Sequence, residues 1–356
     1  MHTQPIFLLG FGGVGRALLS QILATRERHK RRNGLKLAVL GIADSAGAAG
    51  DAERALSDAA LRKALSVKLE TGRLPHTAAT RANLQALVKR LPANTILVDT
   101  SASAVTVPAL IKGKKRGLGV VLANKLPVAG DLAWWDAIAD SRSRWETTCG
   151  AALPVISTLN TLLDSGDTVH RIEGTLSGTL GFVASQLEAG VKFGDAVRDA
   201  RMRGYTEPDP RQDLGGLDVA RKALILARML GYRLEMKDVK VESLYPKLMD
   251  RLTVDDFMRD VDSLNGSMAA RVADLTSGGN KLRYAAVIEN GKLKAGLVSA
   301  DPASKLGISR ASDSVVIFFT QHFTDNPVMI SGRGAGQAVT ASGVLGDIVS
   351  LSRVLR

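Results

Sequence analysis

The stretch of this sequence richest in reactive side chains is GYTEPDPRQDLGGLDVARK, from Gly204 to Lys222. It is acidic although the whole chain carries a formal net charge of +12; its acids are Glu207, Asp209, Asp213 and Asp218. Proline fixes its own φ and restricts the residue before it, so the prolines at 208 and 210 hold Glu207 on a stiff, nonhelical arm. The stretch is therefore a candidate site.

A helix is expected after the paired glycines 215 and 216, with Asp218 and Lys222 at positions i and i+4. On an exposed face such a pair contributes only a few tenths of a kcal/mol. At about 100° per residue, however, the pair shares a face with Ile225, whereas Arg221 and Arg228 lie together elsewhere. We predict that the arginines mark the solvent edge and that the Asp218–Lys222 pair is buried in a cleft, where it could transfer a proton.

The second reactive element is a glycine-rich turn, GFGGVG, between an apolar run and a helical pattern. Glycines at its first, third and sixth positions allow a tight turn, the approach of a pyrophosphate to the backbone, and close packing of helix on strand. The free N–H groups of the helix N-terminus attract the phosphates. In this context the motif predicts a dinucleotide-binding turn with the residues Gly10, Gly12, Gly13, Val14 and Gly15.

Further polar residues end the other expected strands of this first region. Asp44 ends the strand 35–44, where a carboxylate usually accepts the ribose 2′-OH of NAD; Ser45 and the basic run 26–32 leave NADP open. Thr100 and Ser101 end the strand 95–101, and Lys125 ends the strand 119–125. Because the carboxyl ends of parallel strands share one edge, all of these residues are candidates for cofactor binding.

Strands alternating with helices predict an α/β fold, a Rossmann-type doubly wound parallel sheet, for residues 1–146. After residue 147 the pattern changes to helices followed by strand pairs, which indicates an α+β domain over 147–331. Asn290-Gly291 predicts a hairpin within it. The segment 332–356 completes the first domain with a helix capped by Thr340 or Ser342. We interpret the basic run RERHKRR, residues 26–32, as an exposed loop.

Composition narrows the class of protein. Aromatic residues make up 4% of the chain and the basic residues are scattered, which favours a solvated basic surface over a nucleic-acid interface. The single cysteine, Cys149, excludes an internal disulfide framework and suits a reducing compartment. No signal peptide and no apolar run long enough for a membrane helix are recognisable, so we expect a cytoplasmic protein, or an organellar stromal one if a transit peptide was removed.

From end to end the chain resembles homoserine dehydrogenase. The Gly204–Lys222 stretch is similar to that family's long signature, with further matches in GFGGVG, ANK, ETTCGAALPVI, LSGTLGF and GRGAGQAVTASGVLGD. The resemblance implies reversible, NAD- or NADP-dependent oxidation of L-homoserine to L-aspartate 4-semialdehyde, in the biosynthesis of threonine, methionine and isoleucine. It also implies a homodimer formed through the second domain, without the aspartokinase portion of fused relatives or a regulatory domain.

The resemblance further implies residue roles. Lys222 exchanges the proton of the substrate oxygen, with Lys125 as a second lysine at cofactor and substrate. The substrate, a small zwitterion, is held chiefly through its ammonium group by Glu207, Asp213 and Asp218. Thr100 and Gly336 meet the cofactor. The family pattern is not kept at Leu126, Gly181, Phe182 and Gln212, and the change at Gly181-Phe182 removes polar groups from the substrate loop.

A monovalent cation, Na⁺ or K⁺, is also implied by the resemblance. Its ligands would be the Glu146 carboxylate and the backbone carbonyls of Cys149, Ala151 and Leu153.

Two other functions remain open from the residues themselves. Cys149 as a nucleophile would make the protein a phosphorylating semialdehyde dehydrogenase, although a single cysteine is most often a small core residue. A non-catalytic module that binds NAD(P) or nucleic acid is the alternative outside enzymes, and the acidic stretch argues against a polyanion there.

Overall fold

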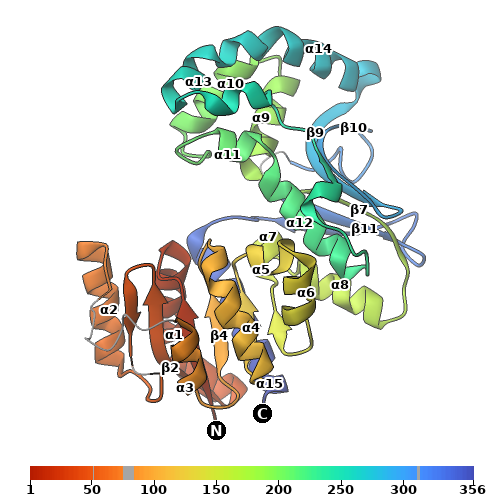
Figure 1. Ribbon diagram of the computed structural model, residues 1–356. Coiled ribbons are helices and arrows are strands. Elements are labelled where there is room, and N and C mark those ends of the chain that lie inside the picture. The colour runs from red at the N-terminus through yellow and green to blue at the C-terminus, as the bar shows by residue number, and fades with distance from the viewer. Residues whose placement is uncertain (51, 75–83, 311–312) are drawn as a thin grey trace. The chain divides into compact units, whose positions relative to one another are not determined.

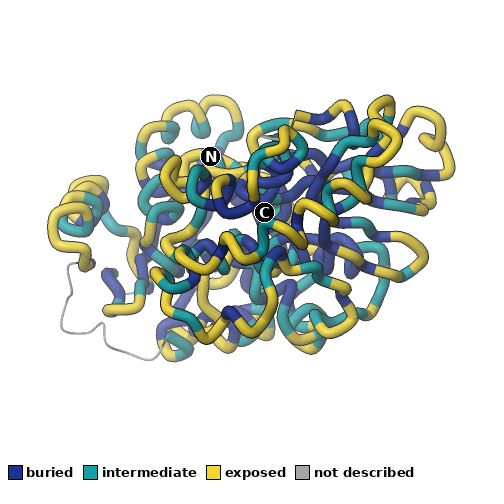
Figure 2. Tube along the Cα trace, turned by 90° about the horizontal axis from the view of Figure 1, so that it is seen from above, coloured by how far each residue is buried: buried dark blue, intermediate teal, exposed yellow. Residues whose placement is uncertain are grey.

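The computed structural model describes residues 1–50, 52–74, 84–310 and 313–356, which divide into two compact units (Figure 1). Unit 1 comprises Met1–Ala152 and Ala335–Arg356, and unit 2 comprises Leu153–Gly334. In both units the buried residues lie mostly along the strands and on the helix faces turned toward them (Figure 2). None of the helices in the described ranges is long and apolar enough to cross a membrane.

Unit 1 contains a six-stranded sheet in the order β3-β2-β1-β4-β5-β6. All neighbouring strands are parallel except β3, which pairs antiparallel with β2. The strands are β1 (His2–Leu9), β2 (Leu35–Asp44), β3 (Gly47–Ala49), β4 (Ile96–Asp99), β5 (Gly119–Leu122) and β6 (Ser143–Arg144). The predicted Rossmann-type α/β fold is thereby confirmed.

The helices of unit 1 bury the apolar strands, because a parallel sheet is stable only when it is covered. Leu18 and Ile22 of α1 and Val344 and Ile348 of α15 belong to one core cluster with β1 and β4. The helices are α1 (Gly13–Asn33), α2 (Asp58–Thr71), α3 (Leu84–Arg90), α4 (Val107–Lys115), α5 (Leu126–Ala129), α6 (Leu132–Ile138), α7 (Thr147–Gly150) and α15 (Gln337–Val354).

The basic run at residues 26–32 belongs to α1, so its interpretation as an exposed loop is wrong. Tertiary contacts extend the helix: Arg26 donates to the Leu37 carbonyl and forms an ion pair with Asp58 at 3.0 Å. Cations in the last turn also interact favourably with the negative end of the helix dipole. The helix ends only at Gly34, whose φ of 59° is readily adopted by glycine.

The start of α15 also differs from the prediction. Gly336 is the N-cap, and its carbonyl accepts a hydrogen bond from Thr340 N at 2.8 Å, so Thr340 and Ser342 lie inside the helix. The Gly336 backbone has φ 119° and ψ 137°, a conformation that L side chains rarely adopt. Glycine therefore ends the preceding strand connection and opens this helix without a side-chain cap.

Unit 2 is built on a second six-stranded sheet, in the order β12-β11-β7-β9-β10-β8, antiparallel except where β8 meets β10. Asn290 and Gly291 have φ values of 50° and 71° and form the predicted hairpin between β9 and β10. The strands are β7 (Val169–Thr175), β8 (Val239–Val241), β9 (Lys281–Glu289), β10 (Lys292–Ala300), β11 (Ser314–Thr320) and β12 (Val328–Gly332).

Helices α9 and α12 pack on this sheet. Of the candidate site residues of unit 2, Asp218 and Lys222 lie on α12, Asp213 lies on α11, and Glu207 precedes α11. The helices of the unit are α8 (Val155–Asp164), α9 (Gly178–Glu188), α10 (Phe193–Met202), α11 (Arg211–Leu214), α12 (Leu217–Met229), α13 (Val254–Asp260) and α14 (Asn265–Leu275).

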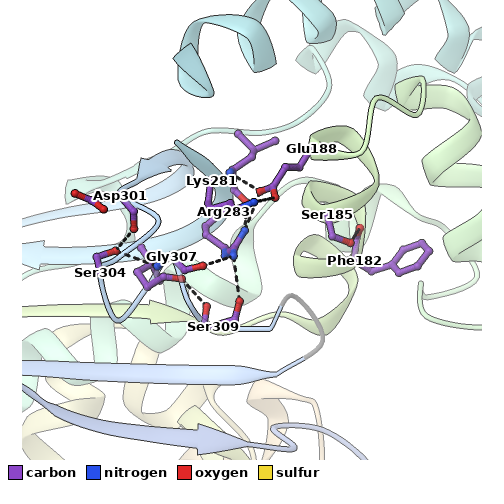
Figure 3. Close-up of polar contacts among 11 residues, drawn as sticks. Phe182, Ser185, Glu188, Lys281, Arg283, Asp301, Ser304, Gly307 and Ser309 are labelled. Carbon is purple, nitrogen blue, oxygen red and sulfur yellow. Dashed lines mark hydrogen bonds and ion pairs between the residues drawn. The ribbon is translucent and has the colours of Figure 1, made fainter. Parts of the chain in front are cut away.

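A buried arginine fastens the connection that follows β10 (Figure 3). Arg283 of β9 donates to the carbonyl oxygens of Gly307 at 2.7 Å and Ser309 at 3.0 Å. The same guanidinium pairs with Glu188 at the end of α9, at 3.0 Å. Because a buried charge is costly unless it is paired, this arrangement holds the connection and α9 to the same strand.

Candidate active site

The glycine-rich turn lies between β1 and α1, and the structure explains each glycine separately. Gly10 has a φ of 91°, and a Cβ there would overlap the backbone of Ser101. At Gly15 a Cβ would overlap the carbonyl oxygen of Gly10. At Gly12, by contrast, no described atom lies within 4 Å of the Cβ position, and Gly12 is the N-cap of α1. The turn is thus closed by its outer glycines, and its middle leaves room for a phosphate.

The neighbouring strands bring further predicted residues to the same sheet edge. The Thr100 hydroxyl donates to the Gly10 carbonyl at 2.7 Å, so the end of β4 lies against the glycine turn together with Ser101. Lys125 follows β5 and is the N-cap residue of the short helix α5. Gly13 is packed so closely on Gln337 of α15 that a Cβ would overlap that side chain.

Asp44 ends β2 as predicted, but its carboxylate is already engaged. Oδ1 accepts hydrogen bonds from Ala46 N at 2.8 Å and Gly47 N at 3.2 Å, which closes the turn into β3. Oδ2 pairs with Lys68 Nζ of α2 at 2.7 Å. The structure therefore places an acid and a cation together at this edge, and both carboxylate oxygens of Asp44 already accept hydrogen bonds.

Lys222 is the central residue of the unit 2 site. It is 9% exposed, and its Nζ lies 2.8 Å from Asp218 Oδ2 and 2.5 Å from the Leu176 carbonyl oxygen. The predicted burial of the pair is thus confirmed for Lys222 and wrong for Asp218, whose side chain keeps 46% of its accessible surface. The start of α12 is set by Gly216, where φ is 70° and a Cβ would overlap the Tyr284 hydroxyl. This close approach to β9 positions the helix that carries both members of the pair.

The predicted solvent edge of α12 is wrong for Arg228. That residue is 3% exposed, and its Nε donates to the Leu234 carbonyl at 3.0 Å. The guanidinium thus turns back to the chain beyond the helix end, where an acceptor compensates its loss of water. Arg221 is half-buried.

Asp213 lies at the centre of the acidic stretch. Its Oδ2 accepts a hydrogen bond from Glu207 N at 2.8 Å, and its Oδ1 lies 3.1 Å from the Thr179 hydroxyl. Burial raises the pKa of Asp213 above its ordinary value, and the charges of Glu207 and Asp218 raise it further, against the effect of its hydrogen bonds. The repulsion among these three acids favours the arrival of a cationic group.

Asp209, the remaining acid of the stretch, has a structural role. Its carboxylate forms a two-point ion pair with Arg211, at 2.9 and 2.8 Å. Arg211 also donates to the carbonyls of Met249 and Leu252, so the pair fastens the turn near residue 250 to α11.

The residue pair Gly181-Phe182 replaces polar groups of the family pattern with an aromatic contact. The Phe182 ring packs edge-on against Tyr205, with 5.0 Å between ring centroids, and the Arg203 guanidinium lies 5.7 Å from the same ring. This contact links α9 to the first residues of the acidic stretch.

Of the predicted cation ligands, Glu146, Cys149 and Ala151 lie in unit 1, and Leu153 is the first residue of unit 2. The Glu146 N–H donates to Asp347 Oδ2 at 3.0 Å, and Ala151 has a φ of 53°. Side-chain clusters of three or more His, Cys, Asp or Glu that could hold a metal are absent from the described part of the chain. The predicted ligands, one carboxylate and three backbone carbonyls, are all oxygens, the donor type that a hard cation prefers.

Several contributors to these sites were missed in the sequence. Lys68, the partner of Asp44, stands 24 residues later, and the Leu176 carbonyl that accepts from Lys222 is backbone, which leaves no trace in residue types. Asp347 is a buried acid within an apolar helix pattern. An acid in an apolar helix pattern could have been recognised in the sequence as a contributor to the site, because a buried carboxylate requires a partner.

The parallel sheet with its glycine-rich turn, together with a buried lysine paired with a half-exposed carboxylate in unit 2, is the arrangement typical of the class of dinucleotide-dependent dehydrogenases. Two family models match the chain: "homoserine dehydrogenase, NAD binding domain" over residues 10–149 and "homoserine dehydrogenase" over residues 154–349. The chain belongs to the homoserine dehydrogenase family, and the predicted resemblance is confirmed.

Individual relatives agree. A bifunctional aspartokinase/homoserine dehydrogenase of Haemophilus influenzae is 34% identical over 97% of this chain, which spans only 42% of that relative's length. A homoserine dehydrogenase of Emericella nidulans is 32% identical over 98% of this chain and 99% of its own. A hyperthermophilic archaeal homoserine dehydrogenase solved in complex with NADPH is 25% identical, with a TM-score of 0.75 over 99% of this chain and 98% of that one.

Proposed function

We propose that this chain is an NAD(P)-dependent homoserine dehydrogenase that interconverts L-homoserine and L-aspartate 4-semialdehyde. The observation that carries the proposal is the buried Lys222 held by Asp218 beside an acidic stretch, in a chain of this family. The reaction belongs to the synthesis of threonine, methionine and isoleucine.

Proton transfer is the part of the reaction that unit 2 performs. In the oxidation, the neutral amine of Lys222 takes the proton of the substrate hydroxyl while the carbon–hydrogen bond is broken. The bound nicotinamide supplies the chemistry of hydride acceptance. In the reverse direction the ammonium returns a proton to the aldehyde oxygen. Asp218, at 2.8 Å, balances the charge of the lysine in its protonated state and keeps its side chain aimed.

Substrate binding follows from the same acids. Homoserine is a zwitterion, and we assign its ammonium group to Glu207, Asp213 and Asp218. Asp213 is held between Thr179 and the Glu207 N–H, so its position does not depend on the substrate. Burial is the main cause of the raised pKa of Asp213, and the charges of Glu207 and Asp218 add to it. The ammonium relieves this repulsion, and the relief contributes to affinity.

Unit 1 binds the cofactor in this proposal, through Gly10, Gly12, Gly13, Val14 and Gly15, with Thr100, Ser101, Lys125 and Gly336 around them. We propose NADP over NAD. The carboxylate of Asp44 is already satisfied by its turn and by Lys68, and the lysine brings a positive charge to the edge where the ribose binds. A cation there stabilises a 2′-phosphate, whereas NAD requires a free acceptor.

We also keep the monovalent cation, with Glu146, Cys149, Ala151 and Leu153 as its ligands. Its support is the oxygen donor set and the backbone of Ala151, which has a conformation uncommon for a residue other than glycine. The cation would fix the backbone between α7 and α8.

A homodimer formed through unit 2 is the last part of the proposal. Val298, Phe319 and Met329 of the unit 2 sheet are only partly buried and pack against one apolar cluster that contains Ile317. Covering such residues with a second copy removes apolar surface from water. Light scattering coupled to size-exclusion chromatography measures the mass directly.

The test of the activity is an initial-rate assay of L-homoserine oxidation with NADP and with NAD, followed at the reduced nicotinamide, and of semialdehyde reduction with the reduced forms. L-Serine, one methylene shorter, is the control substrate. Turnover of homoserine far above serine, and faster with NADP, is expected. If homoserine is not turned over with either cofactor, while the semialdehyde is oxidised in the presence of phosphate, the protein is instead a phosphorylating semialdehyde dehydrogenase with Cys149 as its nucleophile.

A further inference from the structure

Asp99, the last residue of β4, is a completely buried carboxylate at the cofactor edge of the unit 1 sheet. Its Oδ2 accepts from the Thr106 hydroxyl at 2.6 Å and from Asn124 Nδ2 at 3.0 Å. Its Oδ1 accepts from Ser101 N at 2.9 Å. Burial raises the pKa of Asp99 and these hydrogen bonds oppose the rise. Burying a charged carboxylate is unfavourable unless hydrogen bonds compensate it. The partners of Asp99 therefore indicate which parts of the chain it holds in place.

The neighbour that Asp99 controls most strictly is Asn124, which is 3% exposed. An ionised carboxylate only accepts hydrogen bonds, so Asn124 must turn its NH₂ group toward Asp99. The same NH₂ group donates to the Ser103 carbonyl at 2.9 Å and to the Ser101 hydroxyl oxygen at 3.3 Å. With these acceptors on one side, the Asn124 carbonyl oxygen is turned to the other side, where Leu126 N donates to it at 3.1 Å.

That last hydrogen bond encloses Lys125. A bond from an Asn side-chain oxygen to the N–H two residues later forms a turn around the residue between them. The main chain is tied to the same place, because Ala123 N and Asn124 N both donate to the Asp99 carbonyl, at 2.8 and 3.2 Å. The path of the chain through Lys125 therefore depends on the donor and acceptor sense of the Asn124 amide.

We propose that Asp99 is a positioning residue for Lys125: by accepting from Asn124 it selects the amide orientation that closes the turn around the lysine at the cofactor edge. The proposal rests on the proposed function, in which Lys125 acts at cofactor and substrate. Asp99 itself touches neither, since its carboxylate is fully covered by protein.

The test compares two isosteric changes at one oxygen. In Asp99→Asn the remaining oxygen is required at the Oδ1 position, where Ser101 N donates, and the Thr106 hydroxyl can accept from an NH₂ group at the Oδ2 position. The NH₂ group of residue 99 then opposes the Asn124 NH₂ group and weakens the amide orientation that accepts from Leu126 N. Thr106→Val removes a hydrogen bond from the same Asp99 oxygen but leaves Asn124 its acceptors, and so it is the matched control. Asp99→Asn should lower kcat by about a hundredfold, the scale of a small misplacement, whereas Thr106→Val should stay within about threefold. Both should lower the melting temperature.

A second readout separates positioning from general damage. If Asp99 acts through Lys125, Asp99→Asn should lower kcat no further in a Lys125→Ala background, because effects on one shared function do not add. Equal losses in the two backgrounds, or a near-normal Asp99→Asn enzyme, would overturn the proposal. Should Asp99→Asn fail to fold, Asn124→Ala removes the Leu126 acceptor directly and is expected to show the same loss and the same non-additivity.

The proposed function can fail separately. A wild-type protein that does not oxidise homoserine refutes the activity, whatever Asp99 does. An active wild type with a near-normal Lys125→Ala variant removes the role of Lys125, and the positioning proposal with it, but leaves the activity standing.

Discussion

Lys222 Nζ lies 2.8 Å from Asp218 Oδ2, one helical turn earlier on α12, and the Leu176 carbonyl provides a second acceptor at 2.5 Å. The lysine is 9% exposed, whereas the Asp218 side chain keeps 46% of its accessible surface. The pair therefore reaches from the protein interior to its surface. In the proposed reaction, the half-exposed carboxylate stabilises a proton taken by the lysine.

Replacing Lys222 by Met keeps most of the side chain's length but removes the proton acceptor. We expect turnover in both directions to fall about a thousandfold, the typical contribution of a general base. NADPH binding, measured by its fluorescence, should be unchanged because the glycine turn belongs to unit 1. Arg221→Ala, on the same helix, is the control and should be nearly fully active. Near-normal rates in the Met variant would remove Lys222 from the mechanism.

Asp213→Asn should separate stability from substrate binding. The pKa of Asp213 is raised in the folded protein, chiefly by burial. Such a group adds stability below its unfolded pKa and loses it as the pH rises through the folded value, so at pH 7 the ionised Asp213 destabilises the ligand-free protein. The amide keeps an acceptor for Glu207 N. We expect an equal or higher melting temperature at pH 7 but a KM for homoserine raised about tenfold or more.

Gln212→Ala is the control for Asp213→Asn. It changes the exposed neighbouring side chain and should alter neither the melting temperature nor the KM for homoserine. A clear loss of stability in Asp213→Asn with an unchanged KM would mean that Asp213 holds the fold and not the substrate.

Lys68→Ala should change the choice of cofactor. Without the lysine, the Asp44 carboxylate regains a free oxygen and the edge loses a positive charge. The ratio of kcat/KM for NADP to that for NAD should then fall about tenfold or more, since a 2′-phosphate loses its cation while a 2′-OH gains an acceptor. Lys63→Ala, exposed on the same helix, is the control. Proportional changes with both cofactors would contradict the assignment.

Asp347 should make the stability of the protein depend on pH. Burial, together with the charge of Glu146, raises the pKa of Asp347 to about 8. Its contribution is present below the unfolded pKa of about 4 and is lost as the pH rises to the folded value. We expect the wild-type melting temperature to fall between pH 5 and 9 by several degrees more than that of Asp347→Asn, which keeps an acceptor for Glu146 N.

Calorimetry across that pH range measures both slopes. Asp325→Asn, at an exposed position, should follow the wild type. Equal slopes in wild type and Asp347→Asn would show that this carboxyl does not titrate in the range.

Cys149→Ser distinguishes a homoserine dehydrogenase from a phosphorylating semialdehyde dehydrogenase that uses Cys149 as its nucleophile. The thiol is 1% exposed in α7, so it packs as a small buried side chain. The serine variant should lose about 1 kcal/mol of stability from the buried hydroxyl, yet keep homoserine oxidation. Loss of all activity in a variant with a normal melting curve would favour a thiol nucleophile.

Much of the fold could be predicted because it follows from the spacing of residue types over short stretches of the sequence. Strands in unit 1 appear as short apolar runs, the hairpin at Asn290-Gly291 needs only two residues with positive φ, and Asp218 and Lys222 are brought together by the pitch of one helix. Each of these relationships spans few residues, so residue type and spacing suffice.

The sequence by itself determined the α/β class, the glycine-rich turn and the lysine–carboxylate pair. Tertiary structure decided that residues 26–32 continue a helix and that Arg228 is buried. It also decided that Lys68 forms an ion pair with the Asp44 carboxylate and that Asp99 accepts a hydrogen bond from Asn124. In each case the deciding partner lies outside the residue's own helix or strand. Leu37 and Asp58 contact Arg26, Leu234 beyond the end of α12 accepts from Arg228, Lys68 of α2 pairs with Asp44, and Asn124 after β5 donates to Asp99. A polar group at low dielectric takes whichever partner the packing supplies, and that partner is not set by neighbouring residues in the chain.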